Sequence, residues 1–214
     1  MAYRAFDEIS AGTLKRVGLF CEGDKYDAII TSDGIDPGFL AARMISRIPV
    51  AAALNSAAHF ASLIGDRFSV IHLDDPTAMI VRRAVQNYGL GHKLVSVRSV
   101  GHSSPSTMAV LRKTKKEERA KTPEGNKFID DILAQCLVAI EEDRADSLVF
   151  GTPAVQCLYA EVKQRLDEAG YGEIPIVCGL RSAIEMARSM VNMGIKQAAR
   201  AYPSDALKAR PRFR

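Results

Sequence analysis

Apolar residues along this chain form short runs that alternate with longer stretches of helical periodicity. The runs end in polar or glycine residues and predict strands at 26–32, 47–53, 67–73, 94–100, 147–151 and 174–178. The intervening stretches predict helices at 6–21, 37–46, 56–64, 76–88, 126–142, 155–169 and 181–199. Nearly continuous apolar strands are typical of a parallel sheet covered on both faces. The repeated order of strand, turn and helix therefore predicts an α/β fold of the doubly wound kind.

Two helix starts are indicated by an acid directly before a proline. Asp36 precedes Pro37, and Asp75 precedes Pro76. Asp is favoured at the N-cap of a helix, and proline is favoured at its first turn. We therefore expect both acids to cap the helices that follow them.

The chain contains an internal repeat. YDAIITSDG (26–34) is followed by a helical stretch and RIPVAAALNSAAHFASLIG, and ADSLVFGTPA (145–154) by a helical stretch and EIPIVCGLRSAIEMARSMV. Asp27 and Asp146 open the two copies, and each copy breaks into a polar turn six residues later, at Asp33 and Thr152. The repeat predicts two α/β lobes, at 1–92 and 93–200, followed by a basic C-terminal tail at 201–214.

The two copies differ in what precedes them. A strand at 94–100 and a helix at 126–142 come before the second copy, whereas only a helix at 6–21 comes before the first. The first lobe is therefore predicted to lack its N-terminal strand. Either the true start lies upstream, or one sheet edge is open and a partner chain covers it. We expect a homo-oligomer for that reason.

Composition and charge narrow the class of protein. A chain of 214 residues with 47% hydrophobic and 25% charged residues is typical of one domain, or of two small domains that share a core. The net charge of +4 is concentrated at 112–121 and 208–214, without the interleaved aromatics of a nucleic-acid platform, so we expect no nucleic-acid partner. The chain shows neither a signal peptide nor an apolar run of membrane-spanning length, so we expect a cytoplasmic protein without membrane contact. The four cysteines are widely spaced without a CxxC pair, which argues against a disulfide framework or structural zinc.

The repeat also suggests a chemistry. In α/β sheets of this kind, ligands bind beyond the carboxyl ends of the strands. Two lobes related by a pseudo-twofold axis would place Asp33 and Thr152 across one cleft. Such a cleft suits a reaction in which one residue removes a proton from a carbon and another returns a proton on the far side, which is racemisation or epimerisation.

At these residues the chain resembles the aspartate/glutamate/hydantoin racemase superfamily, and most closely its hydantoin and allantoin racemase branch. The resemblance covers most of the chain from Tyr26 to Val191. It rests on IITSDGIDPGFLAAR (29–43), IPVAAALNSAAHFASLIGDRFSVI (48–71), YGLGHKLVSVRSVG (88–101), AIEEDRADSLVFGTPA (139–154) and IPIVCGLRSAIEMA (174–187). The DPG turn and the ASLIGDRFSV run are its most specific parts.

The resemblance implies a racemase without cofactor that acts on a small molecule, with one cysteine thiol per lobe flanking the acidic carbon. In this chain Asp33 stands at the first cysteine position, and Thr152 stands at the second. A carboxylate in a dry cleft is a competent base, whereas a threonine hydroxyl is too weak an acid to match it. The residues leave three function classes open: a racemase or isomerase for an amino-acid derivative or cyclic ureide, a diverged lyase or hydrolase with Asp33 as general base, or a non-catalytic relative. Asp33 as a turn residue that caps a helix, and Thr152 as a turn hydroxyl, are the structural alternatives.

Further candidates surround the same turns. His102 is the histidine we expect to serve catalysis, because it lies in the polar segment GHSSPST (101–107) directly after a strand. This segment opens a long connection (101–125) that predicts a lid. The alternative for His102 is an exposed loop histidine without a catalytic role. The alternative for Arg181, a candidate for binding substrate, is a surface residue of a helix. No histidine and acid are spaced like metal ligands, so we expect no metal. The residues expected to bind substrate are Ser32, Gly34, Ile35, Asn55, Ser56, Ala154, Cys178 and Arg181.

Overall fold

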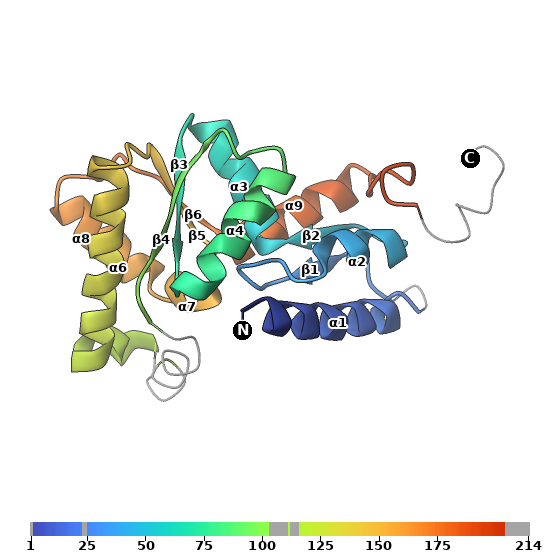
Figure 1. The fold of residues 1–214 in the computed structure, drawn as a ribbon, viewed down its shortest axis with the longest axis horizontal. Coiled ribbons are helices and arrows are strands. Elements are labelled where there is room, and N and C mark those ends of the chain that lie inside the picture. The colour runs from blue at the N-terminus through green and yellow to red at the C-terminus, as the bar shows by residue number, and fades with distance from the viewer. Residues whose placement is uncertain (1, 23–24, 103–110, 112–115, 204–214) are drawn as a thin grey trace.

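The structure is a computed structural model that describes residues 2–22, 25–102, 111 and 116–203. Within these residues, six strands form two parallel sheets surrounded by helices (Figure 1). The strands are β1 (Ile29–Thr31), β2 (Val50–Ala52), β3 (Phe68–His72), β4 (Leu94–Ser99), β5 (Ser147–Phe150) and β6 (Ile176–Cys178). The helices are α1 (Ala2–Phe20), α2 (Phe39–Ile45), α3 (Ala53–Ile64), α4 (Asp75–Asn87), α6 (Pro123–Glu141), α7 (Pro153–Gln156), α8 (Tyr159–Glu168), α9 (Gly179–Asn192) and the 3₁₀ helix η1 (Lys116–Lys121). The α/β prediction with parallel sheets is confirmed.

The larger sheet has the strand order β4-β3-β5-β6 and is covered on both faces. On one face, Val70 and Val149 pack against apolar side chains of α3 and α4. On the other face, Ile71 and Leu148 pack against α6 and α8. Successive side chains of a strand point to opposite faces of the sheet. Because apolar helix faces cover both faces here, nearly every residue of a strand must be apolar.

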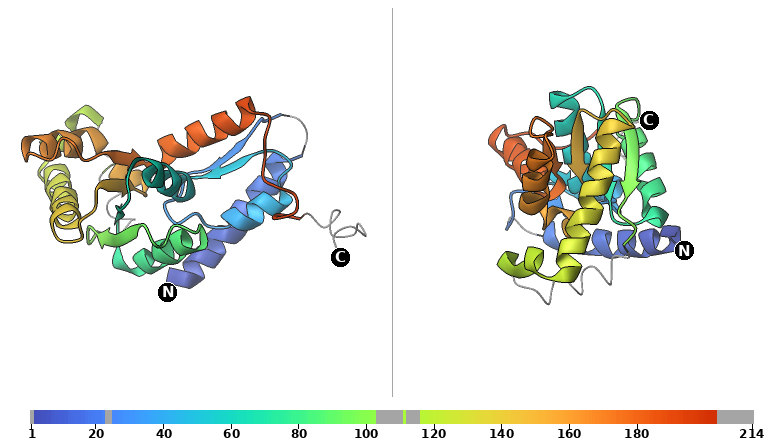
Figure 2. Two further views of the ribbon diagram at one scale, coloured as in Figure 1. Left: turned by 90° about the horizontal axis from the view of Figure 1, so that it is seen from above. Right: turned by 90° about the vertical axis from the view of Figure 1, so that its left-hand side faces the viewer.

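The smaller sheet contains β1 and β2, with Ile29 opposite Val50 and Thr31 opposite Ala52. Helix α9 lies along one side of this sheet, and α1 and α2 lie on the other (Figure 2). Ala183 and Ala187 of α9 pack on Ala51. Because α9 follows β6 of the larger sheet, it joins the two halves of the molecule.

The internal repeat is also a structural repeat. The order α1-β1-α2-β2-α3 matches α6-β5-α7/α8-β6-α9, and α1 and α6 both have 19 residues. Both β3 and β4 pair within the larger sheet, and among the described residues the smaller sheet contains β1 and β2 alone. The lobe boundary at 92/93 stays a prediction, although β3 (68–72) hydrogen-bonds with the strands that follow it.

Several predicted helix limits were wrong. The cap of α4 is Asp74 rather than Asp75, because its side chain accepts the hydrogen bond from the backbone amide of Thr77. The helix predicted at 155–169 is divided into α7 and α8 at Leu158, whose fully buried side chain lies in the core and whose φ of −110° is not helical. The helix predicted at 181–199 ends at Asn192, and Gly194 follows with a φ of 64°, as is common after a helix end.

Two predictions concern residues outside those described. Residues 103–110 and 112–115 of the expected lid, and residues 204–214 of the basic tail, belong to this group. Within the part of the chain that the structure describes, none of the helices combines the length and apolar character needed to span a membrane.

Candidate functional site

The turns that follow β1 and β5 touch each other between the two sheets. A Cβ atom added at Gly34 would lie 2.9 Å from the carbonyl carbon of Gly151 and 2.9 Å from the backbone nitrogen of Thr152. Real Cβ atoms do not approach backbone atoms so closely, so only glycine fits at position 34. The structure thus brings together the two turns that the repeat made equivalent.

A second pair of equivalent positions is also in contact. A Cβ atom on Gly179, the first residue of α9, would lie 3.2 Å from both the Cβ and the carbonyl oxygen of Ala53, the first residue of α3. The starts of these helices follow β2 and β6. The carboxyl ends of four strands therefore converge, which is where ligands bind in parallel α/β sheets.

Asp33 is a half-buried carboxyl in the first of these turns. The backbone amide of Ile35 donates a hydrogen bond to its Oδ1 at 3.0 Å. Burial raises the pKa of Asp33 above its ordinary value of 3.8, and the bond from Ile35 opposes this only in part. A carboxylate with a raised pKa is a stronger base, so Asp33 can accept a proton from a bound molecule.

Asp36 lies in the same turn as Asp33, and its hydrogen-bond partners could not be predicted from the sequence. It does not cap α2, whose N-cap is Gly38. Instead its buried carboxyl accepts hydrogen bonds from the backbone amides of Leu54 (3.0 Å) and Asn55 (2.7 Å) at the start of α3, and from the hydroxyl of Tyr88 (2.9 Å). Burial raises the pKa of Asp36 to about 7 against these bonds. An acid before Pro-Gly indicates the N-cap of the next helix. The first backbone amide that Asp36 binds instead, that of Leu54, lies 18 residues further along the chain, and no local sequence pattern reveals that contact.

Asp36 also holds the Asp33 turn in place. Its backbone has a φ of 48°, a left-handed conformation that Asp tolerates better than most residues. Its backbone amide donates to the carbonyl of Asp33 at 3.3 Å. Because the side chain is fixed to α3 and α4, the turn carrying Asp33 is anchored to both helices.

Thr152 begins α7. Its hydroxyl accepts a hydrogen bond from the backbone amide of Val155 at 3.4 Å, which is the geometry of an N-cap. Ala154 in the same turn is buried, while Pro153 lacks an amide hydrogen. The hydroxyl oxygen of Thr152 therefore accepts a structural hydrogen bond, and the hydroxyl hydrogen can still be donated to another group.

His102 is held against α6. Its Nε2 lies 2.8 Å from Oδ2 of Asp131, and its ring packs edge-on against Phe128 with centroids 4.7 Å apart. Lys127 binds the same carboxylate at 2.6 Å. Within the described residues, the hydrogen bonds of His102 lead to α6 and to the backbone of Leu73, and none leads to Asp33.

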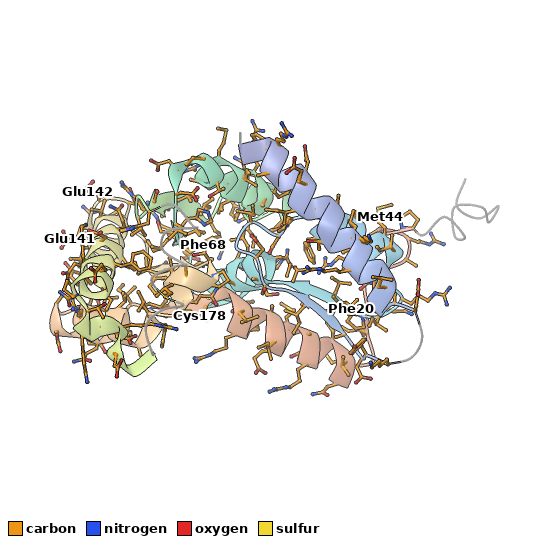
Figure 3. All side chains as sticks on the ribbon, turned by 90° about the horizontal axis from the view of Figure 1, so that it is seen from below. Phe20, Met44, Phe68, Glu141, Glu142 and Cys178 are labelled. Carbon is orange, nitrogen blue, oxygen red and sulfur yellow. The ribbon has the colours of Figure 1, made fainter. Side chains whose placement is uncertain are left out.

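Cys178 and Arg181 line one hollow of about 610 Å³ between α7, α8 and α9. Cys178 is the last residue of β6, in the middle of the molecule (Figure 3). Burial raises the pKa of its thiol to about 11, although nearby Arg181 lowers it slightly, so the thiol is neutral at pH 7. The exposed guanidinium of Arg181 lies 5.6 Å from the ring centre of Tyr159. Gln156 fixes this region, because its side chain donates to the carbonyl of Gly151 (2.8 Å) and accepts from the amide of Leu180 (2.9 Å).

The first-lobe candidates around Asp33 are mostly buried. Ser32 is exposed, whereas Gly34 and Ile35 are buried in the turn. Asn55 is 6% exposed, and its backbone is occupied by Asp36 and by Nδ1 of His59. Ser56 is fully buried, and its hydroxyl lacks a hydrogen-bond partner among the described residues.

The described residues contain no group of three or more His, Cys, Asp or Glu side chains arranged to hold a metal ion. The four cysteines are free thiols. The expectation of a site without metal or cofactor stays a prediction.

Comparison with known proteins identifies a family. The sequence model described as Asp/Glu/Hydantoin racemase matches residues 10–187. A hydantoin racemase from Pseudomonas sp. (strain NS671) is 26% identical over 176 residues, covering 82% of this chain and 62% of the relative. A hydantoin racemase from Rhizobium meliloti is 27% identical over 173 residues, covering 81% of this chain and 64% of the relative. This chain therefore spans less than two thirds of the length of the curated relatives it matches.

A solved structure has the same fold. The allantoin racemase from Pseudomonas fluorescens superimposes with a TM-score of 0.74 at 24% sequence identity, over 95% of this chain and 76% of that one. This likeness confirms the expected racemase-like architecture.

Proposed function

We propose that this chain, which belongs to the Asp/Glu/hydantoin racemase family, is a cofactor-independent isomerase for an amino-acid derivative or a cyclic ureide of the hydantoin type. The observation that carries the proposal is the contact between the two equivalent turns, one of which presents a carboxyl with a raised pKa. The hydantoin racemase relatives support the substrate class.

In this proposal Asp33 is the base. Its ionised carboxylate removes the proton from the acidic carbon, and the charge left on the substrate spreads onto the neighbouring carbonyl oxygen. A proton must then return to the opposite face of that carbon, from the side of Thr152. Thr152 is a weak acid, so its hydroxyl can give a proton to the carbon only if a water molecule supplies the hydroxyl with another proton. We therefore expect proton removal to be faster than inversion.

One observation favours a second candidate. Thr152 already caps α7, and His102 is paired with Asp131, so both candidate partners are engaged elsewhere while Asp33 keeps a raised pKa at the junction of the turns. A lyase such as a decarboxylase needs a single proton donor or acceptor on one face. Asp33 is sufficient for that reaction.

Deuterium exchange from D₂O tests the isomerase proposal. The compounds are enantiopure 5-substituted hydantoins, allantoin, aspartate and glutamate, analysed by mass spectrometry and NMR. Exchange at the acidic carbon should occur with wild type and vanish with Asp33→Asn. The exposed Asp27→Asn serves as the matched acid-to-amide control and should keep the activity. Exchange that survives in Asp33→Asn would exclude Asp33 as the base, and no exchange with any compound would remove the isomerase proposal.

The replaced thiols offer a second test. The resemblance implies a cysteine at both positions, so the double variant Asp33→Cys with Thr152→Cys recreates two matched acids. If the junction of the turns is the site, this variant should invert a hydantoin faster than wild type, whereas Asp33→Cys alone, which still has the weak acid Thr152 on the other face, should not. Equal rates in all variants would place the reaction elsewhere.

We further propose a cytoplasmic homo-oligomer. The four free thiols suit a reducing compartment. Within the described residues β1 pairs with β2 alone, and its half-exposed Ile30 lies on an edge that a partner can cover. Sedimentation of a monomer at micromolar concentration would contradict this assembly.

A further inference from the structure

Helices α1, α2 and α4 and the turn that carries Asp36 line a cavity that is partly open to solvent. It has a volume of about 410 Å³ and lies within the usual range of small-molecule sites. We call it the α1 cavity. Its wall is mainly apolar and includes Phe6, Leu14, Phe39, Ile80 and Ala84.

The α1 cavity has one buried acid in its wall. Asp36 lines it and is only 4% exposed. The ionised carboxylate has about four acceptor positions, of which Oδ2 uses two, for Asn55 and Tyr88, and Oδ1 uses one, for Leu54. One acceptor position on Oδ1 remains.

Asp36 also lacks a cation. Among the described residues, no lysine or arginine forms an ion pair with it, although buried carboxylates are usually paired. Its three donors are neutral groups. A ligand that brings a positive charge and spare N–H donors would satisfy both the charge and the remaining acceptor.

We propose that the α1 cavity binds a small protonated amine on an apolar body, with the ammonium group at Asp36 and the apolar part against Phe6, Leu14 and Ile80. An ammonium group has three donors and no acceptor, which matches a carboxylate that still accepts. The apolar body gains by leaving water for the apolar wall. This site shares the turn from Asp33 to Asp36 with the proposed isomerase site, but it does not depend on that function.

The pH dependence follows from the charges around Asp36. The pKa of Asp36 is about 7 without ligand, mainly because of burial. Its ionised fraction therefore rises about tenfold between pH 6 and pH 8. Amine binding should strengthen over the same interval and release a proton at pH 6. The other titratable or charged groups around Asp36 and its cavity are Asp33 in the same turn, Arg83 of α4, Tyr88 directly after α4, Arg43 of α2, Tyr3 of α1 and Tyr202.

Calorimetric titration with benzylamine, which stays protonated at both pH values, tests the proposal. We expect benzylamine to bind about tenfold more tightly at pH 8 than at pH 6. Benzyl alcohol has the same shape without the charge, and benzoate has the opposite charge, so both should bind at least tenfold more weakly. Equal binding of the three compounds, tighter binding of benzoate, or no binding of benzylamine at millimolar concentration would overturn the proposal.

Three variants locate the amine. Asp36→Asn should abolish binding by removing the charge. Ala84→Phe leaves Asp36 unchanged but fills the α1 cavity, and should also abolish binding. Thermal unfolding of Ala84→Phe verifies that it is folded. Asp33→Asn should keep the binding, and loss of binding in Asp33→Asn with binding intact in Ala84→Phe would place the amine at the isomerase site and refute this inference.

Discussion

Replacing Asp36 by Asn should change how the stability of the protein depends on pH. In wild type two opposing effects act on the ionisation of the buried Asp36 carboxyl. Loss of water penalises its ionised form, while hydrogen bonds from Leu54, Asn55 and Tyr88 favour it, each by roughly 1.5–3 kcal/mol. The pKa of Asp36 is nevertheless about 7, so burial outweighs the bonds.

The sign and magnitude follow from that pKa. Because the pKa in the folded protein lies above the ordinary value of 3.8, the folded state holds this proton more tightly than the unfolded state does. The resulting contribution to stability is complete below about pH 4 and is lost as the pH rises through about 7. A difference of about three pKa units, at ~1.4 kcal/mol each, corresponds to about 4 kcal/mol. Asp36→Asn cannot titrate and should lack this loss.

Urea unfolding followed by circular dichroism at pH 4.5, 6 and 8 measures the effect. The unfolding free energy of wild type minus that of Asp36→Asn should fall by roughly 3–4 kcal/mol across this range. Asp27→Asn, which removes an exposed acid, should follow wild type. A difference that grows with pH would show that the hydrogen bonds outweigh burial, and a constant difference would show that the two effects balance. Either result would refute the reasoning.

Three further substitutions test other parts of the structure. Gly34→Ala should destabilise the protein by roughly 1–3 kcal/mol in thermal or urea unfolding, since its Cβ meets backbone at 2.9 Å, whereas Gly12→Ala in open space should not destabilise it. Asp143 forms a two-point ion pair with Arg98 (2.7 and 2.5 Å) that lowers the pKa of Asp143, so its stabilisation is present above about pH 4 and is lost on acidification. Asp143→Asn should therefore lower the melting temperature at pH 7, and by progressively less as the pH falls below about 4. The thiol of Cys178, with a pKa of about 11, should have only about one thousandth as thiolate at pH 8, and rapid iodoacetamide labelling at that pH, lost in Cys178→Ser, would contradict its burial.

Much of the fold could be predicted from local patterns. The apolar runs located all six strands, because a strand buried on both faces must be apolar at nearly every position. The repeat located the two turns, because equivalent elements need equivalent residues. The pairing of strands could not be predicted in this way. β3 follows the first copy in sequence but lies between β4 and β5, since strand order depends on packing among distant segments.

The sequence by itself determined the family resemblance, the parallel α/β architecture, and Asp33 and Thr152 as equivalent turn residues. Only the tertiary structure decided that Gly34 abuts Gly151 and that Asp36 serves α3 rather than α2. The physical reason is range. Periodicity and turn chemistry act between neighbours in the chain, whereas burial, charge and close contact depend on which distant segments the folded protein places around each group.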